Sequence, residues 1–290
     1  MNIVRIMRKV GIIAKTHLTY PTEVVVDLIK WLKEKKIEVF FDKETAGAIG
    51  LKSKQSRLEI IPIVDFLIVL GGDGTLLSVA RLVAGKSVPV MGVNMGNLGF
   101  LTEITRDEIY TVLEKVLEGD FKTEERLLLD IKVLRESEKI AEHKVLNDIV
   151  VNKGVLARIV DLEVKINNQF VTSYRSDGLI ISTPTGSTAY SLAAGGPIVY
   201  PTLHALILAP ICPFNLTHRP IIIPDDVSIE VQLATDHADV HITLDGQVGL
   251  GMKYRDVIEI KRSKDSIKLI KAPDKNHYEV LRKKLKWGER

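Results

Sequence analysis

The sequence predicts an N-terminal Rossmann-like, doubly wound α/β domain followed by an all-β, sandwich-like domain. Up to about residue 123, short apolar runs alternate with amphipathic helical segments, which is the pattern of a parallel sheet. From Arg126 on, short apolar runs are separated by polar or glycine turns, which is the rhythm of a β-sandwich. With 290 residues, 46% of them hydrophobic, the chain is long enough for two such cores.

The first domain, residues 1–123, is predicted from its alternating elements in chain order. Buried strands are expected at four apolar runs, 10–14, 37–41, 66–70 and 88–93. Helices are expected over 21–35, 75–83 and 105–118. The first of these helices has Val24, Leu28 and Leu32 at helical spacing, and the last carries Asp107 and Glu108 in its first turn.

The second domain, residues 124–267, is predicted to be almost entirely strand. The expected strands are 127–134, 144–151, 160–166, 170–173, 178–182, 221–223, 227–233, 240–244 and 257–260. One helix, near 188–194, interrupts them and ends at Gly195, a residue type common at helix C-termini.

Composition excludes several classes of protein. The net charge of +3 is small and the basic residues are scattered, so no nucleic-acid partner is expected. Cys212 is the single cysteine, so no zinc cluster or internal disulfide can form, and a reducing cytoplasm fits. Prolines at 210 and 213 interrupt the apolar stretch 205–214, which is far shorter than the roughly 18 residues of a membrane span, so no membrane association is expected.

The most informative segment is the turn Gly71-Gly72-Asp73-Gly74-Thr75, between an apolar strand and a helical run. Such a turn leaves backbone N–H groups free to face a phosphate. A carboxylate in it would repel that phosphate unless it had another task, such as binding a metal or accepting a proton from an attacking hydroxyl. The alternative is that the glycines only shape the strand exit and that Asp73 is the helix N-cap.

A second candidate site is the hydroxyl- and glycine-rich stretch 182–191, where an apolar strand meets the start of the expected helix near Thr188. Capping that helix needs one hydroxyl, and the surplus favours contact with an anion or a ribose. The hydroxyl-bearing residues are Ser182, Thr183, Thr185, Ser187 and Thr188.

Two shorter patterns have ordinary explanations when taken alone. Asn147-Asp148 could bind a ribose diol or an amide edge, but without other context a polar pair on a solvated strand face is the preferred interpretation. Asp245-Gly246 between apolar runs is a strong hairpin signal, so a turn is its first interpretation.

Taken together, these motifs resemble the bacterial NAD kinase family in content and order. The resemblance extends from about residue 10 to 287 and rests on the turn at 71–75, Asn97-Leu98-Gly99-Phe100-Leu101, Asn147-Asp148, the stretch 176–190 and Asp245-Gly246-Gln247. It implies phosphorylation by ATP of the 2′-hydroxyl of the adenosine ribose of NAD, giving NADP. The glycine turn alone is shared with diacylglycerol kinases and phosphofructokinases, whereas the stretch from Ser176 to Pro197 is more discriminating.

The resemblance also implies roles for individual residues. Asp73 would accept the proton, Gly74 would lie against the dinucleotide, and Gly71, Gly72, Gly74 and Thr75 would form the phosphate turn. The implied NAD-binding residues are Asp73, Gly74, Asn147, Asp148, Arg158, Arg175, Asp177, Thr188, Ala189, Tyr190, Ser191 and Gln247. Mg²⁺ would arrive on the ATP phosphates with few protein ligands, and no residue of the chain is assigned as a metal ligand. The family also implies a homotetramer or homodimer and a final segment, 268–290, that returns to the first domain.

Two positions depart from the family pattern. Ser78 stands where many relatives carry a basic residue, and Phe214 stands where several carry histidine. Two other functions remain open: a lipid or sugar kinase that uses the same glycine turn, and a non-catalytic module that senses NAD(P). The choice between NAD and NADH, the choice between ATP and polyphosphate, and feedback by NADP(H) also remain open.

Overall fold

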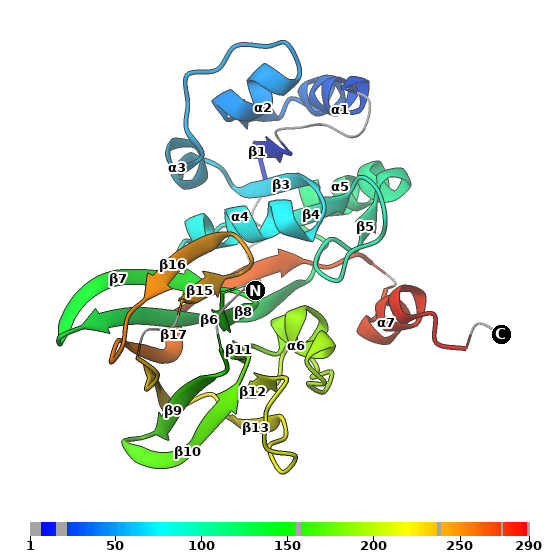
Figure 1. Ribbon diagram of the computed structural model, residues 1–290. Helices are drawn as coiled ribbons and strands as arrows, with labels where there is room; N and C mark the ends of the chain where they lie inside the picture. The colour runs from blue at the N-terminus through cyan, green and yellow to red at the C-terminus, as the bar shows by residue number, and fades with distance from the viewer. Residues whose placement is uncertain (1–6, 16–21, 155–157, 237–238, 274, 289–290) are drawn as a thin grey trace. The chain divides into compact units, whose positions relative to one another are not determined.

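The computed structural model describes residues 7–15, 22–154, 158–236, 239–273 and 275–288. The chain divides into two compact units, residues 1–125 with 267–290 (unit 1) and residues 126–266 (unit 2). Unit 1 is an α/β layer structure and unit 2 is built of sheets (Figure 1). The predicted fold class, an α/β domain followed by a sheet-rich domain, is therefore confirmed. Among the described residues, no helix combines the length and the apolar character needed to cross a bilayer.

Unit 1 alternates strands and helices along most of its length. Its elements are β1 (Lys9–Ala14), α1 (Glu23–Glu34), β2 (Glu38–Phe41), α2 (Lys43–Ala48), α3 (Arg57–Ile60), the 3-10 turn η1 (Ile61–Ile63), β3 (Phe66–Gly71), α4 (Asp73–Val83), β4 (Val90–Asn94), β5 (Ile104–Thr105), the 3-10 turn η2 (Arg106–Glu108), α5 (Ile109–Leu117) and α7 (His277–Leu285).

The strands of unit 1 pair in parallel in the order β2-β1-β3-β4. The chain leaves β1 toward β2 and then returns to the other side as β3, so the order of connections reverses between β1 and β3. In open α/β sheets, ligands bind at the carboxyl ends of the strands beside such a reversal. The turn that follows Gly71, the last residue of β3, lies at this edge of the sheet.

Helices cover both faces of this sheet. One face packs against α1 and α5, whose Leu28 and Leu113 share a core cluster with Ile12 and Ile68 of the strands. The other face receives α4, which lies alongside β3 and β4 (Figure 1). A side chain at Gly92 of β4 would come within 2.6 Å of Leu76 Cδ1, so the glycine lets the helix approach closely.

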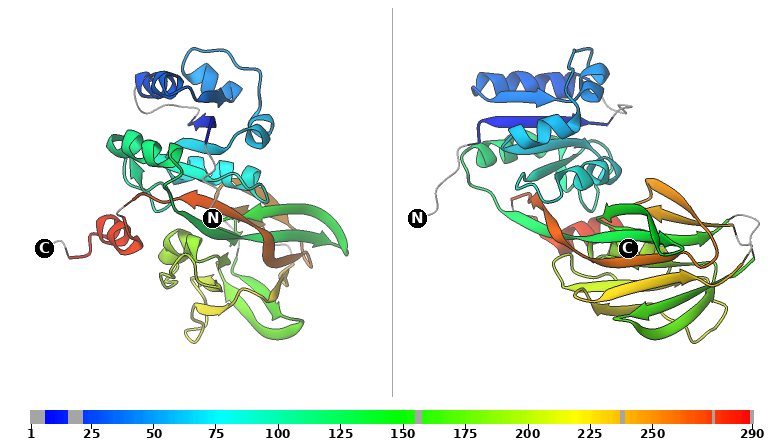
Figure 2. Two further views of the ribbon diagram at one scale, coloured as in Figure 1. Left: turned by 180° about the vertical axis from the view of Figure 1, so that it is seen from behind. Right: turned by 90° about the vertical axis from the view of Figure 1, so that its left-hand side faces the viewer.

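Unit 2 contains two sheets whose inner faces share one apolar core (Figure 2). The strands are β6 (Thr123–Arg135), β7 (Glu138–Val145), β8 (Asp148–Lys153), β9 (Val160–Ile166), β10 (Gln169–Ser176), β11 (Gly178–Ser182), β12 (Ala205–Ile211), β13 (Ile221–Pro224), β14 (Ser228–Leu233), β15 (Val240–Leu244), β16 (Val248–Met252) and β17 (Val257–Ile270). One sheet has the antiparallel order β13-β12-β11-β8-β15-β16. Between β11 and β12 the chain forms the 3-10 turn η3 (Thr185–Thr188) and the short helix α6 (Tyr190–Ala193).

Most predicted strands are present, and two predictions need correction here. The helix expected from Thr75 begins at Asp73, with Gly72 as its N-cap. The strand expected over 144–151 is two strands that break at Leu146 and Asn147, because the carboxylate of Asp245 binds the backbone N–H groups there. Several elements that the sequence did not indicate, among them α2, α3, β5, β12 and β16, complete the two units. Pro21 of the first predicted helix lies outside the described residues.

Gly178 tests the close packing of β11 against its neighbours. A methyl group there would lie 2.2 Å from the carbonyl oxygen of Val151 on β8, and backbone cannot move aside cheaply. We expect Gly178→Ala to reduce the free energy of unfolding by about 2 kcal/mol or more, measured by urea denaturation. The matched control is Gly249→Ala on β16, where no heavy atom lies within 4 Å of the new methyl group, so stability should be unchanged or slightly raised. Equal losses in the two variants would contradict this account.

Candidate active site

The glycine turn in unit 1 joins β3 directly to α4. Gly72 adopts an extended conformation as the N-cap, and Asp73 is the first residue of the helix. A side chain at Gly71 would lie 2.4 Å from Thr75 Oγ1, so glycine is required at that position. The alternative in which Asp73 caps the helix is wrong, because its carboxylate is directed to a different partner.

That partner is the loop formed by residues 99–102, which we call the Asp73 loop. Asp73 Oδ2 accepts the backbone N–H of Phe100 at 2.8 Å. Asp73 Oδ1 accepts the N–H groups of Leu101 at 3.1 Å and Thr102 at 3.0 Å, and the Thr102 hydroxyl at 2.9 Å. A carboxylate offers about two acceptor directions on each oxygen, so Oδ2 is the oxygen with room for another proton donor.

Gly99 makes this wrapping possible. A methyl group at Gly99 would lie 2.0 Å from Asp73 Oδ1, which is closer than any real contact. The sequence Asn97-Leu98-Gly99-Phe100-Leu101 therefore has a structural reason for its glycine, namely the close approach of the loop to the carboxylate.

Ser78, the first departure from the family pattern, lies beside a cation. Its hydroxyl donates to the carbonyl of Thr75 at 2.7 Å and accepts from Arg57 Nη1 at 3.2 Å. Arg57 Nε also binds the buried carboxylate of Asp42 at 2.7 Å. Burial would raise the pKa of Asp42, but hydrogen bonds from Thr45 and Arg57 outweigh it and the pKa is lowered. A guanidinium from α3 thus stands next to position 78 although the residue there is neutral.

In unit 2, the Asn147-Asp148 pair is held by the carboxylate of Asp245. This carboxylate accepts the N–H groups of Leu146 at 3.0 Å and Asn147 at 2.7 Å, and that of Asp148 at 3.3 Å. The carbonyl of Asn147 in turn accepts the N–H of Thr183 at 2.9 Å. Asp245 was predicted only as a hairpin residue, and it does form the turn between β15 and β16 with a positive φ of 49°. Its role in holding Asn147 depends on contacts across nearly a hundred residues, which no local pattern indicates.

Three buried polar atoms near this pair have no hydrogen-bond partner among the described residues. They are Asn147 Oδ1, Thr185 Oγ1 and Ser191 Oγ. Buried polar atoms in native proteins are nearly always satisfied, and each exception calls for an explanation. Unsatisfied acceptors and donors on neighbouring segments are suited to the hydroxyl and amide edges of a nucleotide.

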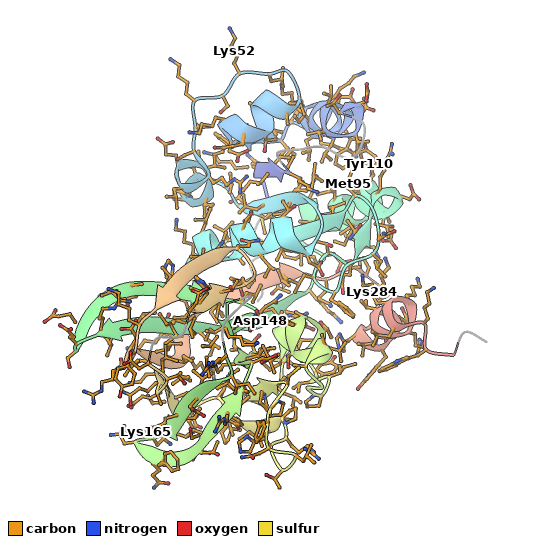
Figure 3. All side chains as sticks on the ribbon, in the orientation of Figure 1. Lys52, Met95, Tyr110, Asp148, Lys165 and Lys284 are labelled. Carbon is orange, nitrogen blue, oxygen red and sulfur yellow. The ribbon has the colours of Figure 1, made fainter. Side chains whose placement is uncertain are left out.

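Asp148 is the strongly perturbed carboxyl group of this site (labelled in Figure 3). It is 4% exposed and accepts the backbone N–H of Tyr190. Burial, followed by repulsion from Asp245, raises its pKa to about 7, and the hydrogen bond from Tyr190 opposes the shift. Perturbed carboxyl groups of this kind concentrate at functional sites.

The hydroxyl-rich stretch folds differently from the predicted helix over 188–194. Residues 185–188 form η3, and α6 spans only four residues without a side-chain cap. Most of the hydroxyl groups hold the turn: Thr183 donates to the carbonyl of Leu146 at 2.6 Å, and Ser187 donates to the carbonyl of Pro184 at 2.7 Å. The surplus of hydroxyls therefore has a largely structural reason, because the irregular backbone needs these bonds.

The other expected binding residues lie on separate elements of unit 2. Asp177 lies between β10 and β11, and its Oδ1 is 3.4 Å from Lys153 Nζ on β8. Arg175 of β10 places its guanidinium 5.5 Å from the ring centroid of Phe214, the second departure from the family pattern. Arg158 and Gln247 are exposed. Thr188, Ala189 and Tyr190 adjoin Ser191, and Tyr190 meets Asp148 as described above.

Comparison with known proteins identifies the family. Residues 10–121 match the model of the ATP-NAD kinase N-terminal domain, and residues 146–272 match that of the ATP-NAD kinase C-terminal domain. The chain belongs to the ATP-NAD kinase family. Its similarity to NAD kinases extends along the whole chain and identifies it as an enzyme of this family.

The NAD kinase of Syntrophotalea carbinolica is 48% identical over 285 residues, covering 98% of this chain and 100% of the relative. That of Geobacter sulfurreducens is 46% identical over 284 residues, with the same coverage.

Two solved structures share the fold. Yeast NADH kinase complexed with NADH superposes with a TM-score of 0.89 at 24% identity, covering 99% of this chain and 89% of that chain. An NAD kinase from Archaeoglobus fulgidus in complex with ATP superposes with a TM-score of 0.75 at 25% identity, covering 95% of this chain and 99% of that chain. The architecture of both units is thus that of the family.

The raised pKa of Asp148 predicts a pH-dependent stability. Because the pKa is about 7 in the folded protein and 3.8 ordinarily, the folded state binds this proton more tightly than the unfolded chain does. Its stabilising contribution is present at acid pH and is lost as the pH rises from about 4 to 7. Relative to the wild type, Asp148→Asn should therefore gain several degrees in Tm at pH 8 compared with pH 5, measured by scanning calorimetry. A Tm difference that does not change with pH would show that Asp148 titrates normally.

Proposed function

We propose that this chain transfers the γ-phosphoryl group of ATP to the 2′-hydroxyl of the adenosine ribose of NAD, giving NADP. The observation that carries the proposal is the Asp73 carboxylate, fixed at the first residue of α4 in a glycine turn, with Oδ2 able to accept one more hydrogen. The similarity of the whole chain to NAD kinases supports NAD and ATP as the substrates.

Asp73 would act as the general base. A ribose hydroxyl attacks poorly at neutral pH unless its proton has an acceptor, and a well-placed carboxylate contributes roughly 10²–10⁴-fold. The Asp73 loop fixes the orientation of the carboxylate through hydrogen bonds from Phe100, Leu101 and Thr102. The proton would pass to Oδ2, since Oδ1 already accepts hydrogen bonds from Leu101 and Thr102.

The polar groups of unit 2 would bind the dinucleotide. Asn147 Oδ1 and the hydroxyls of Thr185 and Ser191 are buried polar atoms without partners among the described residues, and ribose hydroxyls would satisfy them. Asp148 and Asp177 supply carboxylate acceptors for ribose hydroxyls. Thr188, Ala189, Tyr190, Arg158, Arg175 and Gln247 complete the proposed set.

Mg²⁺ would enter with ATP. Its ligands would be chiefly the phosphate oxygens of ATP, because Mg²⁺ is commonly bound through substrate phosphates with few protein ligands. When bound, it would neutralise charge on the γ-phosphoryl group. The protein's contribution is then the orientation of the hydroxyl and the acceptance of its proton.

We also propose that the protein assembles as a homodimer or homotetramer. Unit 2 exposes large apolar side chains, among them Phe170 at 62%, Phe214 at 65% and Leu216 at 85% exposure. Apolar surface of this kind commonly marks a protein interface. Light scattering after size-exclusion chromatography measures the mass, and a monomer at micromolar concentration would overturn the proposal.

One assay tests the activity against the other open functions. The protein is incubated with ATP, Mg²⁺ and NAD, and NADP is measured with an NADP-specific dehydrogenase. Formation of NADP supports the proposal. Absence of NADP together with phosphorylation of a lipid or sugar indicates the second kind of kinase, and NAD binding without any transfer indicates a sensing module. NADH and polyphosphate in parallel reactions define the acceptor and the donor.

Asp73→Asn should lower kcat by about 10²- to 10⁴-fold while the Kd for NAD changes by less than a few fold. The amide keeps the shape of the side chain but cannot accept the proton. Turnover is measured in the NADP assay and NAD affinity by calorimetry, with circular dichroism to confirm folding. Near-wild-type turnover in the folded variant would show that Asp73 is not the base.

Asp73→Asn also weakens the Asp73 loop, so a control must separate the two effects. Thr102→Val removes the hydroxyl that donates to Asp73 Oδ1 and accepts from Asn94 Nδ2, yet it leaves the carboxylate intact. We expect this variant to lose much less turnover than Asp73→Asn. Equal losses in the two variants would assign Asp73 a positioning role in place of proton transfer.

A further inference from the structure

Glu103, directly after the Asp73 loop, has contacts that a surface glutamate would not have. The residue is 5% exposed. Its carboxylate accepts Lys271 Nζ at 2.8 Å and the backbone N–H of Ala272 at 2.9 Å, and its carbonyl accepts Lys275 Nζ at 2.9 Å. All three donors come from the C-terminal segment of unit 1, 168 to 172 residues later in the chain.

The same segment also touches the other end of the Asp73 loop. Lys284 of α7 (labelled in Figure 3) holds its ammonium group 5.4 Å from the ring centroid of Phe100. Phe100 is the residue whose N–H binds Asp73 Oδ2. The C-terminal segment therefore contacts the Asp73 loop near both ends. Lys271 and Ala272 bind Glu103, the residue that follows the loop, and Lys284 lies over the ring of Phe100, the second residue of the loop.

A direct series of contacts thus links the C-terminal segment to the carboxylate. Lys271 binds Glu103, Glu103 is bonded to Thr102, and Thr102 donates its N–H and its hydroxyl to Asp73 Oδ1. A buried carboxylate that loses its partners is costly, so Glu103 strongly favours the loop position in which these bonds form. A shift of the loop would move the hydrogen bonds that orient Asp73.

We infer that Glu103 is a positioning residue for phosphoryl transfer: it fixes the Asp73 loop to the C-terminal segment and thereby orients the Asp73 carboxylate. The inference rests on the proposed function insofar as it concerns turnover. Its structural part, that Glu103 and Lys271 control the order of residues 100–102, stands independently. Misplacement of a catalytic group by about 1 Å can cost roughly 10²-fold in rate, so the effect should be measurable.

The test uses Glu103→Gln in the full-length chain, with Glu108→Gln as the matched control. Glu108 pairs with Lys275, the lysine that also donates to the Glu103 carbonyl, but the Glu108 carboxylate caps η2 through Thr105 and makes no hydrogen bond to residues 99–102 within the described part of the chain. Glu108→Gln therefore leaves the bonds of Lys271 and Ala272 to the Glu103 carboxylate intact. We expect Glu103→Gln to lower kcat at least tenfold with the KM for NAD within about twofold. Hydrogen exchange should become faster at the amides of Phe100, Leu101 and Thr102. Glu108→Gln changes a more exposed carboxylate, so it should lower Tm by less and leave kcat and these amides near wild type.

Lys271→Met is a second variant, which removes the other partner of the same ion pair and can be used if Glu103→Gln does not fold. It should give the same pattern of slower turnover and faster exchange. Wild-type exchange at residues 100–102 in the folded variants, or equal kcat losses in the Glu103 and Glu108 variants, would overturn the inference. If the wild-type protein makes no NADP, the proposed function fails, but the exchange data still decide whether Glu103 orders the loop.

Discussion

The arrangement of unit 1 around the candidate catalytic group depends on the hydrogen bonds between the Asp73 carboxylate and the loop at 99–102. The parallel sheet brings Gly71 to the carboxyl edge, α4 begins at Asp73, and β4 delivers the chain to the loop. The glycine at position 99 exists for this contact, since any side chain would collide with the carboxylate. The turn therefore does more than face a phosphate: it holds a carboxylate in one orientation, and that orientation gives the carboxylate its proposed chemistry.

Unit 2 uses the same physical device in a different setting. Asp245 accepts consecutive backbone N–H groups from Leu146 to Asp148, as Asp73 does from Phe100 to Thr102. A carboxylate is the side chain best suited to this, because its two oxygens accept several charge-assisted hydrogen bonds from a bent backbone. In both units a carboxylate from one hairpin or helix fixes a short irregular segment. In unit 1 the carboxylate itself is the candidate catalytic group, and in unit 2 the fixed segment carries the candidate binding residues Asn147 and Asp148.

The parts of this structure that the sequence predicted are those set by local chemistry. The apolar run before Gly71, the glycine turn and the helix after it are determined by neighbouring residues, and they were found to within two residues. The broken strand at 144–151 was missed because its cause, Asp245, lies about a hundred residues away. Glu103 was missed for the same reason, since a lone glutamate before a short strand carries no local signal. For the hydroxyls of 182–188, local composition cannot separate those that hold a turn, such as Thr183 and Ser187, from one that has no partner within the described residues, Thr185.

Asp148 and Asp245 show why a binding site can oppose stability. The burial of Asp148 and its repulsion from Asp245 raise the pKa of Asp148 to about 7, so the protonated form of this carboxyl group is far more favoured in the folded protein than in an ordinary aspartate. A core designed for stability alone would replace one of them with a neutral residue. Asp245 binds the backbone of Leu146 and Asn147, and Asp148 accepts the N–H of Tyr190 beside unsatisfied polar atoms, so each carboxylate has a contact that a neutral replacement would weaken. A ligand that donated hydrogen bonds to Asp148 would favour its ionised form and so offset part of this cost.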